Sequence, residues 1–562
     1  MRSFLSRLLV PGLVFVAGCS DSPGPDPTVV VSCDPADAGA GTVPMAVFQG
    51  RTVRASELAE CAWVTGSGAK YVVVPQFPTE TATRSLVRYV VGNGGSLAAV
   101  ASGTGNHAVP PAARLDNMLR QIERRLAPSA AREARELRAL SLSSQAIRGP
   151  SLQQVGTSRT FKVLSAIPAN NQQQPTFATV TATLRFAGQN ILIYVDNQSP
   201  SGPNGLSDSV ITKLGTWFDQ DLYPIGVSTF GSESDIDGND RVIVLMTPVV
   251  NGLTDEDNCE VVISGFFFGL DLTQGPNSNQ GEVFYSLVPD PQGAFSCPRP
   301  VAVVEASTPP TFIHEFQHMI SFNQHVVVRD ALDEEPWLNE GLSHIAEEVV
   351  ARHYDNKYPN LPPGRLFSDT ANIFINNDLS NSYDFLESTG TTSLTLFAST
   401  GTLEERGAAW LFLRWLADQK DSTIFARLVQ TNLTSIANVE NVAAESFPVL
   451  FGDWAIALWT DSIPDHPRTS VPERNRYKSR NLRRIYARLN EIAASQFPRV
   501  YPLVPRPLGA GTGVESSMYP GTMEYFLTQA PADPAVGFRF ARPDGQVFSS
   551  TLRPQLGLFR LP

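Results

Sequence analysis

Two histidines and a glutamate in the stretch Thr-Phe-Ile-His-Glu-Phe-Gln-His-Met-Ile (residues 311–320) have the types and spacing of a metal site. Residues four apart lie on one face of a helix, about 5–6 Å apart at Cβ, so His314 and His318 can share one ion. Glu315 is offset from both imidazoles and is free to act as a base. Further along, Glu340 can supply a third ligand from a second helix. Zinc held by two imidazoles and one carboxylate keeps a fourth position open for water, whose pKa falls toward about 7.

A His-Glu-x-x-His pattern can also arise by chance, with both histidines placed as ordinary core residues or exposed on a helix. The composition of the segment opposes that interpretation. The chain has seven histidines, and two of them fall in this short apolar stretch. A helix so apolar should be buried, and its imidazoles then need polar partners. The apolar neighbours are Phe312, Ile313, Phe316, Met319 and Ile320.

The same residues resemble those of the zincins whose third ligand is a glutamate, the group that includes thermolysin and aminopeptidase N. More narrowly, His-Glu-Phe-Gln-His-Met-Ile with the later Trp-Leu-Asn-Glu-Gly-Leu-Ser-His is similar to the hyicolysin-like neutral metallopeptidases. The resemblance covers roughly residues 158–460. It implies hydrolysis of peptide bonds in protein or peptide substrates, with Zn²⁺ on His314, His318 and Glu340 and with Glu315 as general base.

In thermolysin-type enzymes an aspartate often lies four residues beyond the third ligand, where it orients a ligand histidine. His344 stands at that position here, so Glu347 or Glu348 is the candidate to take over the orienting role. Peptide hydrolysis also needs a donor for the tetrahedral oxyanion besides the metal. Tyr383 is the first candidate for that donor, followed by His344 and His325.

Two other functions stay open beside a zinc endopeptidase. One is a surface-binding lipoprotein whose zinc site is structural or inactive; the intact Glu315 argues against it, because a structural zinc site needs no base. The other is an aminopeptidase. The Gly-x-Met-Glu element of aminopeptidase N relatives occurs here at residues 521–524, after the zinc helix instead of before it, which weakens that alternative.

The N-terminus predicts export. Arg2 and Arg7 precede an apolar run that ends in Val-Ala-Gly-Cys, which resembles the lipobox of bacterial lipoproteins. We expect residues 1–18 to be a signal peptide, Cys19 to be acylated, and residues 19–43 to form a flexible tether. The enzyme would then be anchored to a bacterial membrane, facing the periplasm or the cell surface. The alternative is an ordinary secretory signal in which Cys19 is incidental.

Four cysteines remain after Cys19, and in an exported chain an even number suggests two disulfides. Three pairings are possible, and proximity in the sequence favours Cys33–Cys61 and Cys259–Cys297. Free buried thiols are the alternative.

Length and charge limit the architecture. A chain of 562 residues is too long for one core, and its net charge of −12 argues against a nucleic-acid partner. We predict an α+β fold in which a twisted β-sheet and a helical half form a zincin catalytic domain at 157–465. Accessory β modules flank it at 44–108 and 466–562. A helical linker at 109–156, with two helices separated by Pro128, joins the first module to the catalytic domain; a prosegment over the active site is the alternative. The sequence does not indicate an oligomeric state.

Periodicity predicts the elements around the site. Strands are expected at 177–186, 190–196, 241–248 and 282–288, a helix at 206–222, and further helices at 342–354, 404–418, 423–431 and 451–459. Residues 366–402 are rich in Asn, Ser and Thr and read as a long loop bordering the cleft. The stretch Asp-Ile-Asp-Gly-Asn-Asp (residues 235–240) makes Ca²⁺ possible but not favoured, because Met246 stands where an EF-hand needs glutamate. A tight turn is preferred.

Overall fold

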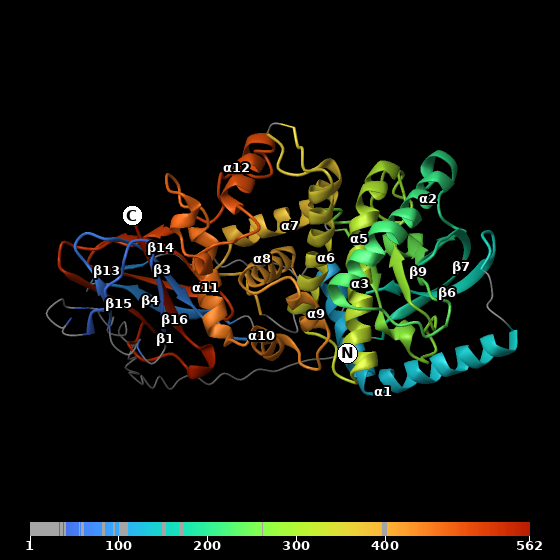
Figure 1. The fold of residues 1–562 in the computed structure, drawn as a ribbon, viewed down its shortest axis with the longest axis horizontal. Coiled ribbons are helices and arrows are strands. Elements are labelled where there is room, and N and C mark those ends of the chain that lie inside the picture. Colours follow the sequence, from blue (N-terminus) through green and yellow to red (C-terminus); the bar gives the residue numbers. More distant parts are fainter. Residues whose placement is uncertain are drawn as a thin grey trace, which may run out of the picture.

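The computed structural model describes residues 33, 38, 41–54, 57, 61–80, 85–93, 96–99, 111–148, 153–167, 174–260, 262–362, 364–395 and 402–562. The predicted signal peptide and Cys19 lie outside these residues, as does most of the predicted tether. Three regions lie in a row (Figure 1). A β-sandwich stands at one end, a sheet half (residues 153–335) at the other, and a helical half (residues 336–505) between them.

The β-sandwich is built from both ends of the described chain. One sheet has the strand order β1-β16-β3-β14-β12 and the other β2-β15-β4-β13-β5. The blue and red strands therefore mix at one end of Figure 1. The strands are β1 (Gly50–Arg54), β2 (Ala62–Thr65), β3 (Lys70–Gln76), β4 (Val87–Gly92), β5 (Ser96–Ala99), β12 (Arg506–Pro507), β13 (Thr512–Met518), β14 (Phe526–Gln529), β15 (Ala535–Ala541) and β16 (Gln555–Leu561).

The two accessory modules expected at 44–108 and 466–562 are thus one unit. Strand β16 pairs with β1 on one side and with β3 on the other, so neither segment completes a sheet alone. Side chains alternate along β3: Tyr71 and Val73 enter the sandwich core, whereas Val72 and Val74 pack against the helical half. The C-terminal segment of this unit also begins later than the expected residue 466, because residues 466–505 pack with the helical half.

The sheet half has the strand order β10-β11-β9-β8-β7-β6. Strands β8, β9 and β11 are parallel, and β10 closes the sheet as an antiparallel edge strand. The expected strands and the helix at 206–222 correspond to elements of this half. The elements are β6 (Ser158–Ala166), β7 (Thr176–Ala187), β8 (Ile191–Asp196), α2 (Asp208–Trp217), η4 (Phe218–Leu222), α3 (Tyr223–Phe230), β9 (Val242–Met246), α4 (Pro248–Asn251), β10 (Gly265–Phe267), β11 (Val283–Ser286) and α5 (Val301–Phe322).

The helical half begins after a π-helical turn, η6 (Asn323–Val328), that follows α5. Its helices are α6 (Pro336–Lys357), α7 (Asp369–Glu387), α8 (Leu403–Gln419), α9 (Ile424–Val429), α10 (Ser435–Ala443), α11 (Phe447–Thr460) and α12 (Leu482–Ile492). Helix α7 corrects the expectation of a loop at 366–402. Ser368 caps it by accepting a hydrogen bond from Ala371 N, and its apolar face, with Phe374 and Ile375, is buried.

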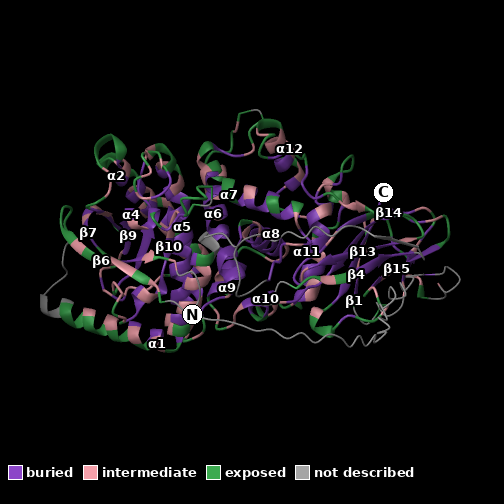
Figure 2. Ribbon diagram, turned by 180° about the vertical axis from the view of Figure 1, so that it is seen from behind, coloured by how far each residue is buried: buried purple, intermediate pink, exposed green. Residues whose placement is uncertain are grey.

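Helix α1 (Pro111–Arg148) is a single helix and passes through Pro128, where two helices were expected. Proline in a helix interior costs about 3 kcal/mol. Burial offsets that cost, because Ala127, Ala130, Ala131 and Ala134 around it are almost fully buried against the rest of the protein. The opposite side of α1 is exposed (Figure 2).

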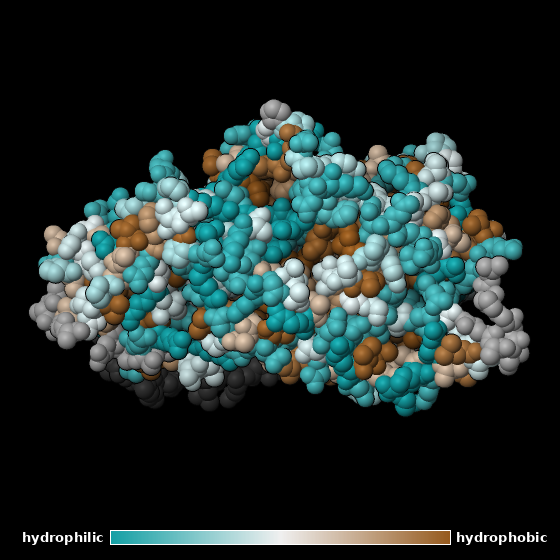
Figure 3. Space-filling view, in the orientation of Figure 1, coloured by the Kyte–Doolittle hydropathy of each residue, from teal (hydrophilic) through white to brown (hydrophobic). Residues whose placement is uncertain are grey.

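Both disulfides are present, Cys33–Cys61 and Cys259–Cys297, and these are the pairs that proximity favoured. Within the described residues, no single helix is long and apolar enough to cross a membrane, although α10 and α11 together reach that length with an 84° bend between them. The face seen in Figure 3 is mostly hydrophilic, and apolar side chains gather near its centre.

Candidate metal centre

Helix α5 carries both candidate histidines in its buried part. Every residue from Thr308 to Phe322 is buried, because one side of the helix packs on the sheet and the other on α6. The spacing of four residues brings the rings of His314 and His318 to 4.9 Å between centroids. Glu340 projects toward them from the first turns of α6 and is 3% exposed.

The three side chains meet at distances that suit a tetrahedral ion. His314 Nε2 lies 3.5 Å from Glu340 Oε2, and His318 Nε2 lies 3.4 Å from Glu340 Oε1. Zinc binds nitrogen and carboxylate oxygen at about 2.0–2.2 Å, so tetrahedral ligand atoms lie about 3.3–3.5 Å apart. The spacing therefore fits one ion at Nε2 of both imidazoles, without movement of the helices.

The far side of each imidazole is held by an oxygen. His314 Nδ1 donates to Glu347 Oε1 at 2.8 Å, and His318 Nδ1 donates to Asn339 Oδ1 at 2.9 Å. Both bonds leave Nε2 turned toward Glu340 and fix the plane of the ring, which is the usual support of a metal-ligating histidine. Glu347 was a candidate for this position; Asn339 was missed, although it directly precedes Glu340.

A second group of possible ligands, His314, His344 and Glu347, shares His314 with the first. Its atoms lie too close together for a metal between them. The distances from Glu347 Oε1 to His314 Nδ1 and His344 Nδ1 are 2.8 and 3.1 Å, which are direct hydrogen bonds. We therefore assign this group to the support of the ligands.

The charges around Glu340 favour a cation. Burial alone would favour the neutral carboxyl, but His318 and His314 outweigh it and hold the pKa of Glu340 well below its usual range. Burial likewise opposes a charged His314, yet its hydrogen bonds to Glu340 and Glu347 raise its pKa well above the usual value. A divalent ion at the two Nε2 atoms would replace these protons and satisfy the same carboxylates.

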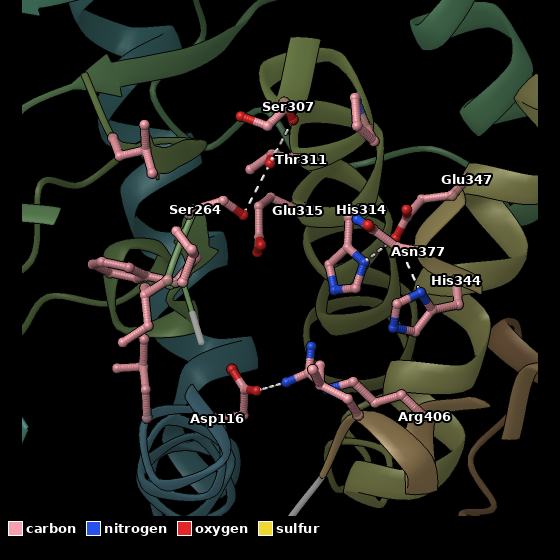
Figure 4. Close-up of a pocket in the computed structure, with 18 of the residues that line it drawn as sticks. Asp116, Ser264, Ser307, Thr311, His314, Glu315, His344, Glu347, Asn377 and Arg406 are labelled. Atoms are coloured by element: carbon pink, nitrogen blue, oxygen red, sulfur yellow. Dashed lines mark hydrogen bonds and ion pairs between the residues drawn. The ribbon is translucent and has the colours of Figure 1, made fainter. Parts of the chain in front are cut away.

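Glu315 lies beside the candidate ligands with its carboxylate pointing into a cavity of about 350 Å³ (Figure 4). The backbone N–H of Phe267, on edge strand β10, donates to its Oε2 at 2.7 Å. Burial raises the pKa of Glu315, and the neighbouring histidines oppose the rise. A carboxylate with a raised pKa next to a metal site is suited to accept a proton and give it back.

Helix α1 forms one wall of this cavity. Leu115, Asp116, Leu119 and Arg120 line it, and in Figure 4 Asp116 points up from α1 to Arg406 on α8. Arg406 Nη1 in turn lies 3.2 Å from Glu340 Oε2. Arg120 is 3% exposed and donates to the carbonyl oxygen of Phe267 at 3.4 Å. The segment expected as a linker is therefore docked at the candidate metal centre.

Two of the expected oxyanion donors lie away from the cavity. The hydroxyl of Tyr383 accepts a hydrogen bond from Arg499 N, and its ring packs on Tyr486 and Phe497, so the expectation for Tyr383 was wrong. His325 is fully buried in η6. The side chain of His344 does line the cavity, and its Nδ1 donates to Asp378 Oδ1 at 2.8 Å.

The structure thus brings together six residues expected at the site: His314, Glu315, His318, Glu340, His344 and Glu347. It adds three that were not expected there: Asn339, Asp378 and Arg406. Of these, only Asn339 had a visible signal, because it belongs to the same short motif as Glu340. Asp378 lies in α7, where a loop was expected, and Arg406 belongs to the first turns of α8.

No protein-family model matches the chain. Among curated proteins, the neutral metalloprotease ShpI of Staphylococcus hyicus is 27% identical over 169 residues. That alignment covers 30% of this chain and 36% of the length of ShpI. The similarity is partial, and it supports a relation to metalloproteases.

Proposed function

We propose that this protein is a zinc-dependent metalloendopeptidase that acts on proteins outside the cytoplasm. The observation that carries the proposal is the separation of 3.4–3.5 Å between Glu340 and the two histidine Nε2 atoms, with a buried carboxylate beside them. The partial similarity to a neutral metalloprotease supports it independently. His314, His318 and Glu340 would hold the metal, and the two imidazoles with one carboxylate are a donor set that zinc favours.

When bound, the metal would act as a Lewis acid that polarises the scissile carbonyl and makes water more acidic. Glu315 takes the proton of the attacking water and returns it to the leaving amine. Its hydrogen bond from Phe267 N keeps the carboxylate turned toward the cavity. Because Phe267 belongs to edge strand β10, the same bond fixes the position of Glu315 relative to β10. A substrate bound along β10 would therefore lie in a fixed position relative to the base.

His344 is the candidate for the second oxyanion donor. Its Nε2 has no hydrogen-bond partner among the described residues, while Asp378 and Glu347 hold its Nδ1. Burial opposes a charged ring, but the two carboxylates outweigh it and raise the pKa of His344 to about 9. A ring that carries protons on both nitrogens can donate from Nε2 to an oxygen that gains negative charge.

The position of β10 favours an endopeptidase over an aminopeptidase. Strand β10 lies at an edge of the sheet, and an edge strand can bind an extended peptide that continues beyond the cleft on both sides, although Phe267 in it already bonds to Glu315 and Arg120. The Gly-x-Met-Glu element lies in the β-sandwich instead, where Glu524 pairs with Arg506 and accepts from Tyr89 OH at 2.5 Å. Glu524 is therefore engaged, and it is not among the residues that line the cavity.

The test measures zinc content and casein hydrolysis for the chain from residue 20 onward, with Glu315→Gln as the variant. Glu305→Gln is the matched control, because it makes the same change on the same helix outside the cavity lining. We expect one zinc per chain in all three proteins and activity lost by at least about 100-fold only in Glu315→Gln. Absence of zinc from the unmodified chain, or equal activity of the two variants, would refute the proposal. Cleavage of N-terminally blocked peptides separates an endopeptidase from an aminopeptidase.

The proposed location rests on residues 1–19 and is supported by the two disulfides, which persist in oxidising compartments. Labelling with a radioactive fatty acid should mark the full chain and leave Cys19→Ser unmarked. Equal labelling of both, or of neither, would remove the lipid anchor from the proposal.

A further inference from the structure

A second group of carboxylates lies away from the candidate metal centre. Asp235 and Asp237 precede β9, and Glu282 directly precedes β11. Because β9 and β11 are parallel neighbours, the chain segments that enter them lie side by side, and Ile243 N donates to the carbonyl oxygen of Glu282 at 2.7 Å. One carboxylate oxygen from each of the three acidic residues lies within 4.8 Å of the others.

The environment of Glu282 is a second, independent observation that points to a bound ligand at these carboxylates. It is 1% exposed, and its Oε1 accepts hydrogen bonds from Ser234 Oγ at 2.6 Å and from Ile236 N at 2.8 Å. Its Oε2 has no hydrogen-bond partner among the described residues. A buried carboxylate oxygen without a partner is costly. Burial, together with the charge of Asp237, raises the pKa of Glu282 to about 8, and burial raises that of Asp237 to about 6.

The loop around these residues forms the tight turn that the sequence favoured, with Gly238 at φ 71° and Asp240 at φ 55°. Asp235 Oδ1 accepts from Asp240 N at 3.0 Å, and Asp237 accepts from the backbone and side chain of Asn239. A turn and a cation site are therefore not alternatives here. The turn presents the carboxylates, as it does in calcium-binding loops.

We propose that Asp235, Asp237 and Glu282 form a calcium site. An EF-hand loop has a carboxylate at its twelfth position. Counted from Asp235, that position here is Met246 in β9, which has no carboxylate. Glu282 supplies one from the position just before the neighbouring strand β11. Calcium binds oxygen at about 2.3–2.6 Å, so its ligand atoms lie up to about 5 Å apart, and three carboxylate oxygens that lie within 4.8 Å of one another can share one ion.

Helix α1 contributes a competing cation. Arg138 Nη1 lies 2.5 Å from Asp235 Oδ2, the carboxylate oxygen that the turn leaves free. Ser141, one turn later on α1, donates to the carbonyl oxygen of Asp237. A calcium ion that takes Asp235 Oδ2 must displace Arg138. The site and the far end of α1 are therefore linked, and removal of the Arg138 charge should favour the ion.

The test is calorimetric titration of calcium into the full zinc-loaded chain, with thermal unfolding in parallel. We expect one calcium per chain and a higher Tm in calcium. Both effects should be lost in Glu282→Gln and in Asp237→Asn, and retained in Asp257→Asn, an exposed aspartate in the loop that follows α4. Arg138→Met should bind calcium several-fold more tightly, a gain that a folding defect cannot produce.

Three results would overturn the proposal. The first is no saturable binding to the unmodified chain up to about 10 mM, above the range of weak extracellular calcium modules. The second is unchanged binding in Asp237→Asn, which decides the matter if Glu282→Gln does not fold. The third is unchanged or weaker binding in Arg138→Met. None of these readouts uses proteolytic activity. The calcium site can therefore be refuted without refuting the proposed function, and the proposed function can be refuted without refuting the calcium site.

Discussion

Replacement of Glu347 by glutamine should weaken metal binding without unfolding the protein. Glu347 Oε1 accepts from His314 Nδ1 at 2.8 Å and lies 3.1 Å from His344 Nδ1, and the residue is 3% exposed. The amide of glutamine keeps one acceptor oxygen but loses the charge that makes His314 a stronger base. Loss of such a partner typically costs 10–100-fold in metal affinity. Because glutamine keeps the shape, we expect about a 10-fold rise in the zinc dissociation constant, or about 1.4 kcal/mol.

Glu348 is the matched control, because it is the adjacent buried carboxylate on the same helix. It accepts from Arg480 Nε at 2.8 Å and lies 3.4 Å from Arg414 Nη1, and neither arginine touches a candidate ligand. Glu348→Gln should therefore destabilise the fold by up to about 3–5 kcal/mol, since it leaves two buried guanidinium groups short of a partner. The zinc affinity of the folded fraction should stay unchanged.

The assay is competition for zinc against a chromophoric chelator, together with urea unfolding of the metal-free proteins. Glu347→Gln should change the first measurement far more than the second, and Glu348→Gln should do the opposite. If Glu347→Gln kept the zinc affinity of the unmodified chain while Glu348→Gln lost it, the assignment of Glu347 as the partner of His314 would be refuted.

Three further predictions concern stability. Burial lowers the pKa of His325 to about 4, so between pH 6.5 and 4 the unfolded chain binds a proton at this residue and the folded protein does not. The free energy of unfolding should therefore fall by up to about 3 kcal/mol as the pH drops from about 6.5 to 4. In urea titrations of the metal-free protein, His325→Gln should remove this part of the pH dependence. A Cβ on Gly407 would lie 2.3 Å from the carbonyl oxygen of Asn381, so Gly407→Ala should cost about 1–3 kcal/mol by calorimetry; an unchanged Tm would contradict this. Arg120→Met leaves Glu123 buried without its cation and should lower the free energy of unfolding in urea by about 3–5 kcal/mol. The double variant with Glu123→Gln should recover part of this loss. No recovery would argue against the Arg120–Glu123 ion pair.

The parts of the site that depend on one helix could be predicted from the sequence. His314, Glu315 and His318 are placed by the pitch of α5, and their neighbours predict its burial. Glu347 lies seven residues beyond Glu340 on α6, which returns it to the same face after two turns. Local periodicity also predicts most strands of the sheet half, because buried strands are short apolar runs.

The remaining parts depend on contacts that local patterns do not report. Asp378 supports His344 from α7, but periodicity counts apolar residues and cannot identify a buried aspartate as part of a helical face. Pro128 predicted a break in α1 that tertiary packing overrides. Tyr383 had a suitable side chain in a suitable region, yet its direction is set by Tyr486 and Phe497, which lie more than 100 residues later.

The strand order of the β-sandwich has a consequence for how the protein is made. Thr52 in β1 pairs with Gly557 in β16, and β16 separates β1 from β3 in the finished sheet. At about 5–20 residues per second, a ribosome needs roughly 25–100 s to synthesise the intervening chain. During that interval β1 and β3 lack their partner, and their open edges could pair with other chains. The sandwich therefore closes only after β16 is synthesised, so an interrupted chain leaves its first strands unpaired and open to proteolysis.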